Sequence, residues 1–181
     1  IDQWTHFLHG PDGNAVAHDQ VVGPPRRLQW VGSPRYSRHH DKMSSISAVV
    51  SSGGRVFYIV DEAPYVSILM PPQWQLVARN AFNGAVLWRR PIGTWHSHLF
   101  GLKSGPAHLP RKLVAIDDRV YVTLGIGEPI TALDAATGEV AKVYEQTENT
   151  DEFVCSNGVL FAVTNADDRG DSIEAARRRG K

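Results

Sequence analysis

The sequence has 181 residues, of which 42% are hydrophobic and 21% charged, enough apolar side chains for one buried core. Nineteen basic and nineteen acidic residues cancel, so no overall field draws the chain to nucleic acid or anionic lipid, and we expect no nucleic-acid partner. The single cysteine, Cys155, excludes an internal disulfide and any multi-cysteine metal or iron–sulfur site. No apolar run approaches the ~18 residues of a membrane-spanning helix, so we expect no membrane span.

The first candidate site lies in the segment SRHHDKM at 37–43, which brings together His39, His40 and Asp41. Imidazole and carboxylate are ordinary ligands of zinc, copper and iron, and loops often carry such sites. Adjacent side chains point to opposite sides of an extended chain, however. A polar loop with hydrogen-bonded histidines is therefore the favoured interpretation, with a metal site as the alternative.

Residues 44–92 alternate between apolar and polar positions with a period of two, which is typical of β-strands. We expect strands near 46–51, 55–60, 75–80 and 85–90. The phrase ARNAFNGAV at 78–86 joins the last two, and its Asn83-Gly84 pair predicts a tight two-residue turn.

The segment WHSH at 95–98 is the second candidate metal site. If it forms a strand, His96 and His98 lie on one face and could chelate a metal with a third ligand from elsewhere. Packing of these histidines against the neighbouring aromatic residues is the alternative, and it is the favoured one.

The phrase at 78–86 recurs as ALDAATGEV at 132–140, offset by 54 residues. Three upstream segments are also similar to one another: GGRVFYIV (53–60), DDRVYVTL (117–124) and SNGVLFAV (156–163). Further strands are accordingly expected near 112–116, 119–124, 130–134, 139–144, 152–155 and 159–164. Repeated units of this size, made of short strands, indicate four-stranded antiparallel blades of a β-propeller.

The offset between the first two upstream segments is 64 residues, ten more than 54, so the first unit carries an insertion at 61–75. This loop is apolar and contains Pro64, Pro71 and Pro72, which a flexible solvated loop would not. We expect it to cover the rim of the propeller or, as the alternative, to bind a partner. Asp61 and Glu62 at its start are a candidate carboxylate pair, although ordinary loop acids are commoner.

The phrase A-x-D-x-x-T-G-x-x-x-W resembles the repeats of the PQQ-binding-like β-propellers, which include quinoprotein alcohol dehydrogenases and the propeller lipoprotein of outer-membrane assembly. In that family the Ala, Gly and Trp of the phrase dock neighbouring blades. The resemblance carries this role to five residues: Ala78, Gly84, Trp88, Ala132 and Gly138. Lys142 stands where a second Trp is expected, so that contact is weakened or replaced, for example by Tyr144.

The resemblance also implies a domain organisation. WTHFLHGPDGNA (4–15) and RRLQW (26–30) are similar to the segment and strand before the first blade, so residues 1–43 are an N-terminal segment with a first closing strand. A blade at 44–92, a linker and blade at 93–146, and the start of a further blade at 147–165 follow. Residues 166–181 form a polar tail with a short helix. The expected fold is an all-β, incomplete propeller of about two and a half blades.

Three functions are open at this point. The first is a binding or scaffold propeller that recognises a protein or polysaccharide and is completed by the remainder of a longer protein or by another chain. The second is part of a quinoprotein dehydrogenase, in which PQQ with calcium would bind only in the complete propeller. The third is a propeller appended to another catalytic domain, such as a methyltransferase. The family resemblance suggests the periplasm or cell envelope.

Overall fold

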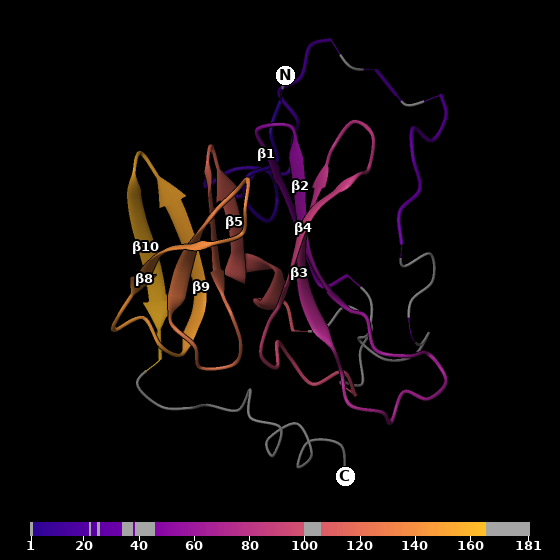
Figure 1. The fold of residues 1–181 in the computed structure, drawn as a ribbon. Coiled ribbons are helices and arrows are strands. Elements are labelled where there is room, and N and C mark those ends of the chain that lie inside the picture. Colours follow the sequence, from indigo (N-terminus) through magenta and orange to yellow (C-terminus); the bar gives the residue numbers. More distant parts are fainter. Residues whose placement is uncertain are drawn as a thin grey trace.

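The computed structural model describes residues 2–21, 23–24, 26–33, 38, 46–99 and 106–165. Within them the fold is all-β, with antiparallel sheets arranged as part of a propeller (Figure 1). The candidate ligands His39, His40 and Asp41 lie outside the described residues, as does the tail at 166–181.

Three sheets follow one another along the chain. The first sheet has the order β1-β2-β3-β4, from β1 (Ala48–Ser52), β2 (Arg55–Asp61), β3 (Trp74–Asn80) and β4 (Val86–Pro91). The second follows a short 3-10 helix, η1 (Leu109–Lys112), and contains β5 (Leu113–Ile116), β6 (Arg119–Thr123), β7 (Ile130–Asp134) and β8 (Val140–Tyr144). The third contains β9 (Thr150–Ser156) and β10 (Val159–Thr164). All ten predicted strands are confirmed, with each end within two residues of its prediction.

The cores lie between consecutive sheets. The largest joins the first and second sheets, where Phe57, Ile59 and Leu76 pack against side chains of β5, β6 and β7. A smaller one joins the second and third sheets, where Val114 and Ile130 pack with Phe153 and Cys155. We call the face that each sheet turns toward the next one along the chain its forward face.

The turns of the two phrases differ from the predicted two-residue turn. Each is a longer loop in which the residue before it accepts two backbone N–H groups on its side chain: Asn80 Oδ1 from Phe82 and Asn83, and Asp134 Oδ1 from Ala136 and Thr137. These bonds wrap the chain back on itself, so that only the final glycine needs a positive φ, 72° at Gly84 and 76° at Gly138. The bonds from Thr137 and Ala136 also lower the pKa of Asp134.

A closing strand was predicted at 26–30, but none of these residues that the structure describes is in a strand. Side chains hold the segment instead. Gln29 Nε2 donates to Phe82 O at 2.5 Å and Trp30 Nε1 donates to Ala81 O at 2.8 Å. These two side chains attach the segment to the turn at 81–84, and the segment forms no β-pairing with that turn. Among the described residues, no helix is long and apolar enough to cross a membrane.

Candidate functional site

The inner edges of the sheets meet at the N-terminal segment. Strands β1, β5 and β9 occupy corresponding places, and one residue of each donates its backbone N–H to a consecutive residue of this segment. Ser51 donates to Trp4 O (2.7 Å), Ala115 to Thr5 O (2.9 Å) and Cys155 to His6 Nε2 (3.1 Å). Residues 4–6 therefore cross the three sheets, one residue to a sheet, and we call them the clasp.

His6 is the member of the clasp that can titrate. Its ring is buried, and Nε2 accepts the Cys155 N–H, so the neutral ring carries its proton on Nδ1 and donates it to Thr5 Oγ1 at 2.8 Å. Burial lowers the pKa of His6, although the charge of Asp12 opposes this shift. The clasp thus depends on a neutral histidine.

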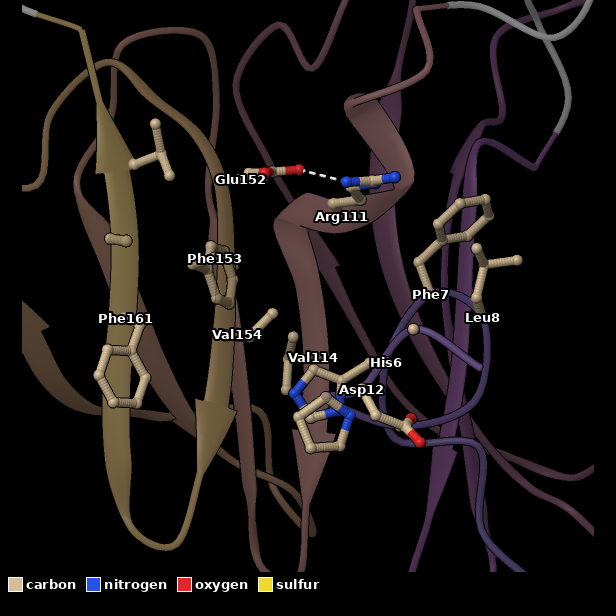
Figure 2. Close-up of a pocket in the computed structure, with 15 residues that line it drawn as sticks. His6, Phe7, Leu8, Asp12, Arg111, Val114, Glu152, Phe153, Val154 and Phe161 are labelled. Carbon is tan, nitrogen blue, oxygen red and sulfur yellow. Dashed lines mark hydrogen bonds and ion pairs between the residues drawn. The ribbon is translucent and has the colours of Figure 1, made fainter. Parts of the chain in front are cut away.

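A groove of about 360 Å³ lies beside the clasp (Figure 2). Phe7 and Leu8 of the loop after the clasp form one wall, and Val154 and Phe161 of the third sheet form another. The Arg111–Glu152 ion pair lines one end of it, with Nη1 and Oε2 2.5 Å apart. The groove is apolar apart from this pair, His6 and Asp12.

Two tryptophans lie over the glycines that end the two turns. A Cβ on Gly138 would stand 2.7 Å from Cδ2 of Trp88, and one on Gly84 would stand 2.6 Å from the same atom of Trp30. Trp88 Nε1 donates to Ala135 O at 3.0 Å, just as Trp30 Nε1 donates to Ala81 O. Only glycine leaves room for an indole ring at this distance.

The two alanines of the predicted docking set lie in the middle strands. Ala78 is fully buried and pairs with Trp88 across β3 and β4, and Ala132 is buried and pairs with Lys142 across β7 and β8. Lys142 is exposed, and its Nζ lies 4.6 Å from the centre of the Tyr144 ring. Tyr144 itself packs against the core between the second and third sheets.

The insertion at 61–75 is organised around one buried ion pair. Arg38 Nη1 donates to Asp61 Oδ2 at 2.7 Å, and both side chains are almost fully buried. The Arg38 guanidinium also donates to three loop carbonyls, while Asp61 Oδ1 accepts from two loop N–H groups, so the pair fixes the loop backbone. The carbonyls belong to Pro64, Ser67 and Met70, and the N–H groups belong to Ala63 and Gln73.

Asp61 and Glu62 do not act as a carboxylate pair. Asp61 is bound by Arg38, whereas Glu62 Oε2 lies 2.6 Å from Nη1 of Arg89 on β4. Each carboxylate is neutralised by its own arginine. The sequence placed these two acids side by side but gave no signal for their separate partners.

The tip of the insertion is apolar and exposed. Tyr65 is 76% exposed, Val66 88% and Leu69 77%, while Ala63 and Trp74 at the two ends of the loop are buried. No charged residue occurs from 63 to 78. The loop is thus anchored at its base and presents an uncharged surface at its tip.

His96 and His98 lie in a connection rather than in a strand, so the geometry assumed for chelation is wrong. His98 Nε2 donates to Ile68 O of the insertion at 2.9 Å, and burial together with the charge of Arg38 lowers the pKa of His98. His96 is buried, with Nδ1 3.4 Å from Ser97 O.

A calcium–quinone site does not fit the residues that the structure describes. They contain no group of three or more His, Cys, Asp or Glu side chains that could hold a metal ion. The buried carboxylate of Asp61 is already bonded by Arg38 and two backbone N–H groups. No chemical step through that cofactor follows from these residues.

Comparison with protein-family models gives no match, and comparison with curated proteins gives none at a significant level. Among solved structures, the chain is similar to a europium-containing methanol dehydrogenase, with a TM-score of 0.53 and 11% sequence identity. The alignment covers 88% of this chain and 27% of that one, so the chain spans about a quarter of the length of that protein. The likeness supports the propeller fold.

Proposed function

We propose that this chain is a section of a PQQ-like β-propeller protein that acts as a binding and scaffold module. The insertion at 61–75 carries this proposal. A buried ion pair, Arg38–Asp61, fixes its backbone, while its uncharged tip stays exposed. A rigid loop binds with a smaller loss of conformational entropy than a flexible one, which favours a recognition role.

The sheets form the scaffold that supports this loop. In the proposed arrangement, each tryptophan docks one unit onto the glycine turn of the next. The residues concerned are Ala78, Gly84, Trp88, Ala132 and Gly138, with Trp30 as the equivalent of Trp88. Two contacts of the same geometry support this role, one in each four-stranded sheet.

The tip favours a protein over a polysaccharide as its partner. Val66 and Leu69 are aliphatic, and the exposed surface offers few polar side chains for sugar hydroxyls. Aliphatic side chains gain most by burial against another apolar surface. The partner is therefore a protein with an apolar, uncharged contact patch.

A photo-crosslinking amino acid at Val66 tests this proposal in the full-length protein in its own cells. Val21, which is 91% exposed against 88% for Val66, is the matched control position outside the loop. We expect one discrete protein to be captured from position 66 and not from position 21. Capture of the same set from both positions, or of no protein from position 66, would contradict the binding role.

The second candidate is a section of a quinoprotein dehydrogenase, favoured by the structural likeness to a methanol dehydrogenase. Titrating the full-length protein with PQQ and calcium separates the two. The scaffold proposal predicts that no chromophore is retained after dialysis, whereas one bound quinone per protein would favour the dehydrogenase.

A further inference from the structure

Three other segments lie at the same end of the sheets as the insertion at 61–75. Strands β2, β6 and β8 end there and β3, β7 and β9 begin there, at the lower side of Figure 1. Residues 124–129 connect β6 to β7, residues 145–149 connect β8 to β9, and residues 92–99 follow β4. We call these four segments together the insertion rim.

Residues 92–99 join the insertion to the loop at 124–129. His98 donates to a carbonyl of the insertion, as described above. Nearer β4, Gly93 donates its N–H to Leu124 O at 2.7 Å. Ile126 donates its N–H to Thr94 O at 2.8 Å. The insertion and the second sheet are therefore connected by hydrogen bonds along the rim.

The loop at 145–149 continues this surface. A Cβ on Gly127 would stand 3.3 Å from Asn149 Oδ1, so the two loops of the second sheet are in contact. Thr147 Oγ1 accepts the N–H of Ile130 at 2.8 Å, which fixes the loop at 145–149 to the start of β7. The four segments thus form one continuous surface.

The part of this surface that belongs to the second sheet is acidic. Glu128, Glu145 and Glu148 are exposed, and none of them forms an ion pair within the part of the chain that the structure describes. No lysine or arginine occurs in any of the four segments, although basic and acidic residues balance over the whole sequence. The three carboxylates therefore give the rim a local negative field.

The exposed apolar tip of the insertion, with Tyr65, Val66 and Leu69, lies on the same rim. Burial of an apolar tip supplies affinity but is not directional. Exposed charges beside it each add little affinity, but they steer the encounter and set the orientation of the partner. A protein that complements both parts of the rim carries positive side chains beside its apolar patch.

We propose that the protein bound by the insertion carries lysine or arginine side chains beside its apolar patch, and that Glu128, Glu145 and Glu148 contact this basic flank. The inference rests on the proposed binding role of the insertion, and it adds the charge and the orientation of the partner. In the complex, the apolar patch covers the tip and the basic flank lies over the end of the second sheet.

Two fluorescent peptide probes that differ only in charge test the proposal. Each has the same central run of leucine and phenylalanine, flanked by lysines in one peptide and by glutamines in the other. Fluorescence anisotropy measures their binding to the full-length protein at low and high salt. We expect the lysine peptide to bind about tenfold more tightly at low salt, and this preference to disappear at high salt, because salt screens exposed charges.

Two variants that remove the same number of charges locate this preference. The rim variant lacks the three acids of the insertion rim, and the control variant lacks three exposed acids of the turns at the other end of the second sheet. The substitutions are Glu128→Gln, Glu145→Gln and Glu148→Gln in the rim variant, and Asp117→Asn, Asp118→Asn and Glu139→Gln in the control variant.

We expect the lysine preference to be lost in the rim variant and kept in the control variant. A preference that survives in the rim variant, or that is lost equally in both variants, would overturn the proposal. Equal binding of the two peptides to the wild type would also overturn it, as would binding of neither peptide.

Val66→Ser combined with Leu69→Ser separates this inference from the proposed function. The double variant should weaken the binding of both peptides by the same factor and leave the lysine preference intact. If it changes neither affinity, the binding role of the insertion fails. If the two peptides bind the wild type equally and both bind the double variant more weakly, only the basic flank is contradicted and the apolar tip keeps its role.

Discussion

Gly138 and Gly158 have almost the same backbone conformation, with φ of 76° and 77°, but different surroundings. Trp88 lies directly over the place where a Gly138 side chain would begin, whereas nothing lies within 4 Å of the corresponding place at Gly158. The two glycines therefore separate the cost of left-handed backbone from the cost of displacing an indole ring.

We predict that Gly158→Ala lowers the free energy of unfolding by about 1 kcal/mol, the cost of an L-residue in the left-handed region. Gly138→Ala should lower it by about 2 kcal/mol more, because the new methyl group displaces Trp88. Chemical denaturation of the two variants measures the difference. Equal losses would mean that the indole does not hold this turn.

Trp88→Ala completes the comparison. Removing this buried ring should cost about 3–5 kcal/mol, and in its absence the two glycine substitutions should become equally costly. A variant destabilised by less than about 1 kcal/mol would reject the docking role of Trp88.

At the scale of single elements, the insertion and the clasp depend on buried polar contacts. Asp61→Ala leaves the Arg38 guanidinium buried without its counter-charge, so we expect a loss of about 3–5 kcal/mol and faster proteolysis between residues 63 and 72. Glu62→Ala is the adjacent control. It breaks a partly exposed pair with Arg89, and should cost less than about 1 kcal/mol with no new cleavage. Similar losses in both variants would show that Arg38 does not organise the loop.

The clasp predicts a dependence of stability on pH. The pKa of His6 is lower in the folded chain than its ordinary value of 6.5, so the unfolded chain takes up a proton first as the pH falls. The stabilisation from neutral His6 is complete above about pH 6.5 and is lost progressively below it. Protonation would also place a donor on Nε2 against the N–H of Cys155.

His6→Gln keeps a side-chain acceptor but cannot titrate in this range. The free energy of unfolding of the wild type should therefore fall more steeply than that of His6→Gln between pH 7 and pH 5. His98 also has a lowered pKa but is present in both proteins, so its contribution cancels. If the free energy of unfolding changed with pH in parallel for the wild type and His6→Gln, the role of His6 would be contradicted.

The strands could be predicted from sequence because they depend on local signals. Alternating apolar residues and the glycine turns mark each strand, and the offsets of 54, 64 and 40 residues relate the sheets to one another. Asn80 and Asp134, which form the Asx bonds, belong to the same two phrases. The phrases were interpreted as two-residue turns, so the longer loops were not predicted. The pairing of each turn with a tryptophan was predicted for Trp88 and missed for Trp30, because no such phrase precedes Trp30.

The contacts that could not be predicted join residues far apart in the chain. Cys155 donates to His6 across 149 positions, and Arg38 reaches Asp61 across 23 positions through a segment with no periodicity. No local pattern encodes such pairs, since they depend on how the sheets converge. The strand predicted around His96 and His98 was wrong for the same reason. Their segment contacts the insertion, through the bond from His98 to Ile68, and does not pair as a strand.

At the scale of the whole molecule, the chain is a section of a propeller in which two complete sheets and one partial sheet are stacked. Its two ends are unequal. The N-terminal segment lies against the back of the first sheet, and the forward face of the third is open among the described residues. Stability should therefore be graded along the stack, as in other arrays whose units contact only their neighbours.

Hydrogen–deuterium exchange across the full chain tests this account most directly. We predict slow exchange in β2, β3, β6 and β7, which pair on both edges, intermediate exchange in β9, and fast exchange in β10 at the open end. The account would be contradicted if β10 exchanged as slowly as β6. It would also be contradicted if the whole second sheet, β5 to β8, exchanged as fast as β10.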